Sequence, residues 1–226
     1  MLESSEARLL ATVGEDKLVL DVGGGRRPLA RADWVVDLLP FDEPEPTGGP
    51  ARVTRERWVQ RDVCDRAPWP FDDGQFDFAV CSHTLEDVRD PLWVCSELIR
   101  VARAGYIEVP SRLAEQSWGV AGQLAGWSHH RWLVDVEGDR IVFVLKPHFI
   151  HTEPGVQLPP GFHATLAPGE RVQQLWWDGA FDYAERYFYD HDELVDYLTE
   201  PLRRSGAGAG LGWRLRTRLA RAVRGG

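Results

Sequence analysis

The first half of the chain alternates short apolar runs with polar or glycine-rich segments. Apolar runs of this length, bounded by turn signals, are typical of buried strands. One segment with apolar positions at helical spacing begins with Asp90 and Pro91, residue types that favour the start of a helix. The predicted strands are residues 17–22, 34–38, 58–62, 76–81 and 106–109, and the predicted helices are residues 4–13, capped by Ser4 or Ser5, and 90–102.

Strands joined by crossover segments predict an α/β fold with a doubly wound, mostly parallel sheet covered by helices. The first crossover is shortened, because only about ten residues separate Gly23 from Trp34, close to the lower limit for such a connection. We therefore expect a single helical turn there in place of a full helix.

The second half has a different pattern. Residues 132–136 and 140–145 flank Glu137-Gly138-Asp139 and predict a β-hairpin. Residues 147–170, rich in proline and glycine, favour a loop, and they are followed by a predicted strand at 171–177, a helix at 190–204, a flexible linker at 205–212 and a basic helix at 213–223. We divide the chain into a core of residues 1–112, a substrate-cap region with the remaining strands of the same domain at 113–204, and a linker with a basic amphipathic tail at 205–226.

Charge is distributed unevenly over the 226 residues, whose net charge is −9. Residues 203–226 carry seven arginines and no acid, which leaves 19 basic and 35 acidic side chains for the rest. An acidic body predicts that nucleic acid is not a partner. The tail is compatible with peripheral contact at the inner face of an anionic membrane, and equally with a solvated segment that docks on the acidic body.

Location is constrained by three further features. The sequence contains no run of 18 apolar residues, so no membrane span is predicted, and the N-terminal segment does not resemble an export signal. The three cysteines form no CxxC pair and predict neither a zinc site nor a disulfide framework. A cytoplasmic protein is the simplest interpretation.

A glycine-rich turn follows the first predicted strand and carries the clearest chemistry. The pattern Asp21-Val22-Gly23-Gly24-Gly25 places backbone N–H groups beyond the carboxyl end of that strand, where α/β sheets bind ligands. Pro28 occupies the position of the third glycine in the dinucleotide fingerprint, so a pyrophosphate ligand and a nicotinamide-dependent oxidoreductase are disfavoured. Asp37 and Asp62 end the next two strands. Three such carboxylates suit one ammonium group, one ribose and one adenine amino group, which together describe a cationic aminoacyl nucleoside.

These segments resemble the class I S-adenosylmethionine (SAM)-dependent methyltransferases. The resemblance is carried by LVLDVGGG at 18–25, VVDL at 35–38, the segment 61–91 and ELIRVARAGYIEVPS at 97–111, and it covers about half of the chain. It implies a Rossmann-like fold, SAM as cofactor and S-adenosylhomocysteine (SAH) as product. The cofactor-binding residues that it implies are Asp21, Gly23, Gly24, Gly25, Asp37, Leu38, Asp62, Val63, Cys81, Ser82 and His83. A common variant of the family pattern has a histidine where Asp87 stands here.

Candidate acceptor chemistry lies outside that pattern. His129 and His130 stand between aromatic residues just before a predicted strand, and a neutral imidazole suits a general base near pH 7. We assign substrate binding to Glu108, Arg131 and Trp132, with Glu108 or Glu86 alternatively orienting a histidine. His148, His151 and His163 could form a metal site together with His129 and His130, but the five histidines match no established metal-binding motif, so no metal site is predicted.

The sequence thus predicts a SAM-dependent methyltransferase that methylates oxygen or nitrogen of a small-molecule or glycan acceptor. The alternative is a regulatory or scaffold module that binds SAM or SAH without catalysis. Neither the acceptor nor the oligomeric state follows from the sequence.

Overall fold

A computed structural model describes residues 1–42 and 51–206. Its centre is a six-stranded sheet in the order β3-β2-β1-β4-β5-β8. All neighbouring pairs are parallel except β5 and β8, which are antiparallel. The strands are β1 (Val19–Val22), β2 (Trp34–Asp37), β3 (Trp58–Gln60), β4 (Phe78–Ser82), β5 (Ala104–Pro110) and β8 (Val172–Asp178).

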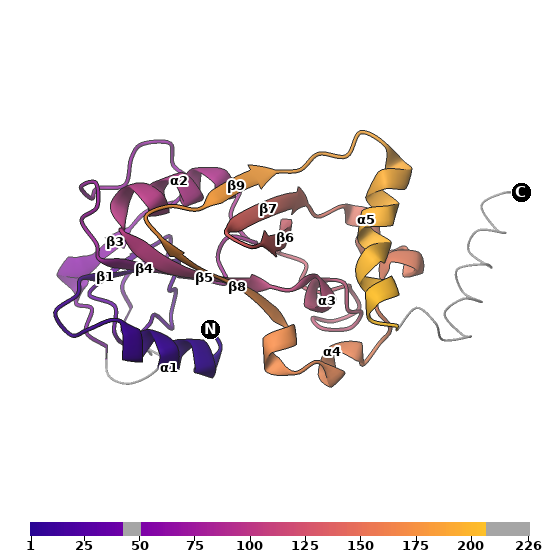
Figure 1. Cartoon of the computed structure of the whole chain (residues 1–226), viewed down its shortest axis with the longest axis horizontal. Coiled ribbons are helices and arrows are strands. Elements are labelled where there is room, and N and C mark those ends of the chain that lie inside the picture. The colour runs from indigo at the N-terminus through magenta and orange to yellow at the C-terminus, as the bar shows by residue number, and fades with distance from the viewer. Residues whose placement is uncertain (43–50, 207–226) are drawn as a thin grey trace, which may run out of the picture.

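Alternating side chains of these strands enter two separate cores. In β2, Val35 packs in the core that contains Leu9 of the N-terminal helix, whereas Val36 packs in the core that contains Leu98 of the following helix. The two helices, α1 (Glu3–Thr12) and α2 (Pro91–Val101), therefore cover opposite faces of the sheet (Figure 1). This layered arrangement confirms the predicted α/β class with a mostly parallel sheet.

A smaller sheet packs beside the central one. It has the order β6-β7-β9, with β6 (Trp132–Glu137) and β7 (Arg140–Leu145) forming the predicted hairpin and β9 (Asp182–Glu185) pairing parallel to β7. Trp132 and Phe143 of the hairpin share the core that α2 helps to form. The remaining helices are α3 (Arg112–Glu115), α4 (Phe162–Thr165) and α5 (His191–Arg204), with short 3-10 helices at Arg55–Arg57, His148–His151, Pro154–Val156 and Pro168–Glu170.

Several local expectations need correction. The first crossover contains no helical turn: it closes through hydrogen bonds from the Arg27 amide to the Gly24 carbonyl and from the Ala32 amide to the Leu29 carbonyl. Neither Ser4 nor Ser5 caps α1, because the helix begins after Leu2 without a side-chain cap. The predicted linker and basic tail lie outside the described residues from position 207 onward.

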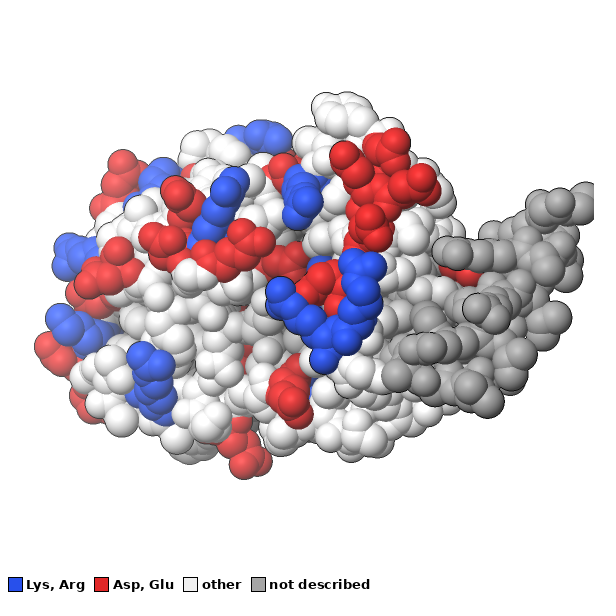
Figure 2. Space-filling view, turned by 45° about the vertical axis from the view of Figure 1, so that its right-hand side comes forward, with Lys and Arg blue, Asp and Glu red and all other residues white. Residues whose placement is uncertain are grey.

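The exposed surface carries charges of both signs. Figure 2 shows acidic and basic side chains interspersed over the face that it presents. Among the described helices, none combines the length and apolarity that crossing a membrane requires.

Candidate functional site

The order of the central sheet places a topological switch point between β1 and β4. β1 lies between β2 and β4, with Val22 opposite both Val36 and Cys81. The chain order reverses at the junction of β1 and β4, and in open α/β sheets ligands bind at the carboxyl ends of the strands at this switch point. The segment after β1 is the glycine turn, and the segment after β4 is residues 83–90.

The glycine turn is built so that a side chain cannot replace its first member. The Gly23 amide donates a hydrogen bond of 2.9 Å to the Val36 carbonyl. Gly23 has φ +75°, and a Cβ on it would lie 2.2 Å from the Thr84 hydroxyl oxygen. Beside Gly25, by contrast, a Cβ would meet no atom within 4 Å. The turn is therefore packed on the Thr84 side and open beyond Gly25.

Two buried carboxylates support this turn. Asp21 accepts a 2.7 Å hydrogen bond from the Leu29 amide, and Asp37 accepts bonds of 2.8 Å from the Gly25 amide and 2.6 Å from the Leu39 amide. Asp21 is 4% exposed and Asp37 is 6% exposed. Within residues 1–42 and 51–206, neither forms an ion pair with a basic side chain. The predicted acids of the first two strands thus lie at the switch point without a basic side chain as counter-ion, and the N-terminal ammonium group is the weakest of the influences on Asp21.

Burial has a clear electrostatic effect on Asp21. Loss of solvent raises the pKa of its carboxyl group to about 7, the Leu29 amide opposes the rise, and the negative charge of Asp37 adds to it. A cationic group placed here would restore the ionised form. Next to Asp37, the side chains of Leu38 and Leu39 are 66% and 45% exposed and offer apolar surface at the same edge.

Asp62 differs from these two acids. It lies two residues beyond β3, accepts a hydrogen bond of 2.9 Å from the Cys64 amide and forms an ion pair with Arg89. Burial would raise the pKa of Asp62, but the hydrogen bonds from Arg89 and the Cys64 amide, together with the charges of Arg89 and Arg61, outweigh that effect and lower it. The neighbouring Val63 is buried in the core. Asp62 therefore reaches the same edge of the sheet with its negative charge already compensated.

The predicted residues at the end of β4 are divided between core and crevice. The Cys81 side chain is fully buried in the core, so its expected contact with a ligand is not available to the thiol. The Ser82 hydroxyl is buried without a hydrogen-bond partner, which leaves a polar atom free at the switch point. His83 has φ +54° and is partly exposed.

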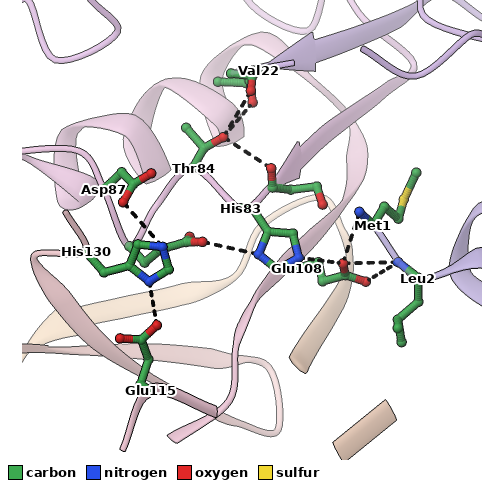
Figure 3. A network of polar contacts seen from close by, with 12 residues as sticks. Met1, Leu2, Val22, His83, Thr84, Asp87, Glu108, Glu115 and His130 are labelled. Atoms are coloured by element: carbon green, nitrogen blue, oxygen red, sulfur yellow. Dashed lines mark hydrogen bonds and ion pairs between the residues drawn. The ribbon is translucent and has the colours of Figure 1, made fainter. Parts of the chain in front are cut away.

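His83 joins two carboxylates of the sheet edge (Figure 3). Its Nδ1 lies 3.3 Å from Glu86 and its Nε2 lies 3.1 Å from Glu108. Burial alone would lower the pKa of His83, but these hydrogen bonds outweigh it and raise the pKa to about 9. Glu86 and Glu108 thus take the histidine-orienting position that the sequence offered as the alternative to substrate binding.

Glu108 is wholly occupied by protein groups. It is fully buried and accepts hydrogen bonds from the Tyr106 hydroxyl at 2.5 Å and from the Leu2 amide at 3.0 and 3.1 Å, in addition to its contact with His83. Burial would raise the pKa of Glu108, but these donors hold it at about 2. The prediction that Glu108 binds substrate is wrong for this conformation, because no lone pair of it faces open space.

A second polar cluster surrounds His130. Its Nδ1 lies 2.5 Å from Glu115 at the end of α3, and Glu115 forms a buried ion pair of 2.8 Å with Lys146. Trp127 stacks on the His130 ring with centroids 4.9 Å apart. His129 is exposed, with its ring edge-on to His130. The two histidines singled out from the sequence therefore have different surroundings.

The segment 127–132 touches the loop after β4 through backbone and side-chain groups. The amides of Arg131 and Trp132 donate hydrogen bonds of 2.7 and 3.1 Å to the Glu86 carbonyl, so the second half of the chain borders the switch point. The Arg131 side chain is exposed. Trp132 is a core residue whose indole donates to the Val88 carbonyl at 2.8 Å, so the prediction that it binds substrate is wrong.

A pocket of about 450 Å³ lies elsewhere, on the smaller sheet. It is lined by both acidic and basic side chains together with Tyr187 and Tyr189. None of the predicted cofactor residues lines it, so it is separate from the switch-point crevice.

Sequence reasoning missed Thr84, Glu115 and Lys146. Thr84 packs against Gly23, and the other two form the buried pair beside His130. Only Thr84 carried a local signal, because it lies in the segment directly after a predicted strand. Glu115 and Lys146 are 31 positions apart and follow no motif.

Comparison with known proteins gives one family match. Residues 47–107 match a family model described as a methyltransferase domain. The sequence matches none of the curated proteins. The family match confirms the resemblance predicted from the sequence, and SAM is the cofactor that such a domain implies.

Solved structures align over part of the chain. A Haloferax volcanii protein in complex with the Trm112 methyltransferase activator is 19% identical over 48% of this chain and 50% of its own, with a TM-score of 0.38. A SAM-dependent methyltransferase from Aquifex aeolicus is 18% identical over 47% of this chain and 64% of its own, with a TM-score of 0.32. One from Mesorhizobium loti is 15% identical over 62% of this chain and 62% of its own, with a TM-score of 0.37. The chain thus spans less than two thirds of each of these proteins.

Proposed function

We propose that this chain transfers a methyl group from SAM to an oxygen or nitrogen of a small molecule or glycan, on the basis of the methyltransferase-domain match over residues 47–107. The observation that carries this proposal is the pair of buried carboxylates, Asp21 and Asp37, that meet at the switch point without a counter-ion. A buried carboxylate is costly unless it is paired, and a ligand bearing an ammonium group and ribose hydroxyls supplies what these two lack.

Each part of the cofactor has a suitable neighbour in this arrangement. Asp21 would accept from the ammonium group, Asp37 from the ribose hydroxyls, and Asp62 with the Val63 backbone would contact adenine. The open side of Gly25 admits a ligand close to the backbone, and the unpartnered Ser82 hydroxyl is free to bind it. When bound, SAM supplies a methyl group activated by its sulfonium for in-line displacement.

The chain's own contribution would be chiefly positioning. Holding two reactants in line is worth about 7–11 kcal/mol when the orientation is near ideal. A base that removes the acceptor proton adds about 10²–10⁴-fold. His83 is unsuitable as that base, because Glu86 and Glu108 hold it in the protonated form. Of His129 and His130, the exposed His129 is the better candidate.

The acceptor region is proposed to come from the second half of the chain. Arg131 is exposed beside the loop after β4 and suits an acceptor that carries a carboxylate or phosphate. A cytoplasmic enzyme whose basic tail contacts an anionic membrane remains part of the proposal, on the evidence of the tail's sequence alone.

Calorimetric titration with SAH tests the cofactor assignment. We expect the native chain to bind and Asp37→Ala to bind at least about 30-fold more weakly, because hydrogen bonds to a charged acceptor contribute about 1.5–3 kcal/mol each. Asp16→Ala is the matched control, since Asp16 is an exposed acid at the opposite end of β1. Equal binding by Asp37→Ala, or none by the native chain, would remove the assignment.

Activity separates the enzyme from a non-catalytic binding module. An enzyme should convert SAM to SAH when an acceptor of the right class is added, whereas a binding module should retain SAM unchanged. A screen of glycans and small hydroxylated or aminated molecules, read as SAH formed, makes this distinction.

A further inference from the structure

Three potential metal ligands lie together outside the crevice. They are Asp87 in the loop after β4 and the adjacent histidines His129 and His130 in the segment before β6. One ligand atom from each residue lies within 4.8 Å of the other two. Figure 3 shows the His130 ring between Asp87 on one side and Glu115 on the other.

In a neutral His130, the hydrogen bond to Glu115 leaves the unprotonated Nε2 facing a carboxylate oxygen of Asp87, so two hydrogen-bond acceptors face each other. The Nδ1 of His130 lies 2.5 Å from a Glu115 oxygen, so the ring hydrogen of a neutral imidazole belongs on Nδ1. The lone pair is then on Nε2, whose neighbour is an Asp87 oxygen at 3.7 Å. That oxygen is buried without a hydrogen-bond partner. A cation between the two atoms would satisfy both.

Charge balance points the same way. The negative charge of Glu115 is already neutralised by Lys146, whose ammonium group lies 2.8 Å away in a fully buried pair. Asp87 is influenced by the charge of His83 as well as by His129 and His130, and the last two are neutral when they act as ligands. The cluster then has a net charge of −1, as in known zinc sites built from two histidines and one carboxylate.

We propose that Asp87, His129 and His130 bind a divalent transition-metal ion of the zinc class. Tetrahedral coordination at about 2.0–2.1 Å separates ligand atoms by roughly 3.3 Å. The 3.7 Å between His130 and Asp87 is close to that separation, and the exposed His129, within 4.8 Å of both, would have to move closer. Glu115 would hold the His130 ring in the required tautomer, a second carboxylate contact that metal-bound histidines commonly make.

Three protein ligands leave a fourth position open. His129 is exposed, so that position would be accessible to water or to an anionic or hydroxyl oxygen. The ion would also tie segment 127–131 to the loop that carries Thr84, which packs against the glycine turn. The proposal does not depend on SAM binding, but it uses His129, so a metal-bound His129 would no longer be available as the acceptor base named above.

Metal binding to the full chain, without SAM, tests the proposal. We expect one Zn²⁺ per chain in competition with a chromophoric chelator, and Co²⁺ in the same site should give the visible absorption of tetrahedral coordination. Asp87→Asn and His129→Ala should each weaken binding at least about tenfold. His163→Ala is the control, because His163 contacts Trp127 but is not part of the cluster.

The possible results divide cleanly. Loss in both cluster variants with retention in the control supports the site, provided that thermal unfolding shows all the variants to be folded. No saturable binding by the native chain overturns it, and so does equal weakening in the control, which would indicate adventitious binding by surface histidines. Binding unchanged in Asp87→Asn also overturns it, because the Asp87 carboxylate would then not be a ligand.

Discussion

Two regions of this molecule bury carboxylates and treat them in opposite ways. Around the glycine turn, Asp21 and Asp37 are bonded to backbone amides and face no positive side chain. Around α3, Glu115 is bonded to His130 and paired with Lys146. Asp21 and Asp37 have no basic side chain as partner, and a cationic ligand could supply one. The Glu115 carboxylate already has the Lys146 ammonium group as its counter-ion.

This difference separates a binding function from a structural one. Breaking a buried ion pair leaves a charge without solvent or partner, so the paired region should respond to substitution mainly in stability. An unpaired buried acid already carries its desolvation penalty in the free protein, so its effect should appear mainly in ligand affinity.

The largest effect is expected from Lys146→Met. It leaves Glu115 buried without its cation and should lower the free energy of unfolding by about 3–5 kcal/mol, measured by urea denaturation. Lys17→Met is the control, because Lys17 is half exposed and its contact with Asp77 is 3.8 Å. That control should change stability by less than about 1 kcal/mol. Equal losses in the two variants would show that the buried pair is not special.

A smaller effect should distinguish two glycines of positive φ, one from each region. Gly23→Ala adds a Cβ against Thr84, whereas Gly138→Ala in the hairpin turn adds one to open space. We expect losses of about 2–3 kcal/mol for Gly23→Ala from combined backbone strain and overpacking, and about 1 kcal/mol for Gly138→Ala from strain alone. Urea denaturation of both variants measures the difference, and a Gly138→Ala loss as large as that of Gly23→Ala would contradict it.

The smallest effect concerns two histidines in opposite environments. Burial of His83 would lower its pKa, but its carboxylate partners raise the pKa to about 9. For His151, burial and the nearby Lys146 lower the pKa below its ordinary 6.5. Nuclear magnetic resonance titration of the ring protons should order them accordingly, and Glu108→Gln should move the pKa of His83 back toward 6.5. A native His83 that titrates near 6.5 would contradict the network.

The sign of the associated pH effect follows from these values. His83 has a higher pKa in the folded chain than in the unfolded chain, so its contribution to stability is complete below about pH 6.5 and is lost as the pH rises through about 9. Glu108, with its pKa lowered to about 2, contributes above about pH 4.5 and loses its contribution as the pH falls toward 2.

Much of the first region could be predicted from the sequence because its signals are local. The apolar runs that become β1, β2 and β4 are short and end in turn residues, and the Asp90 cap and Pro91 begin α2 as expected. Asp37 stands at the end of β2, so its place at the sheet edge followed directly from the strand order.

The second region was less predictable because its contacts are long-range. Glu115 meets His130 and Lys146 only because α3 and the hairpin pack together, and no spacing rule encodes that. β9 is short and polar, and its parallel pairing with β7 depends on the path of the preceding chain. The aromatic character of Trp132 suggested a substrate contact, but the same character suits the core position that it occupies.

The most direct test of the central claim is the affinity for SAH, measured by calorimetry between pH 5.5 and 7.5. With the pKa of Asp21 at about 7, the carboxylate that would receive the ammonium group is mostly protonated at the lower end of this range. We expect the affinity for SAH to fall by up to about tenfold for each pH unit below 7, and we expect Asp21→Asn to bind weakly with little pH dependence. Affinity that is independent of pH, or equal in the native chain and in Asp21→Asn, would contradict the claim.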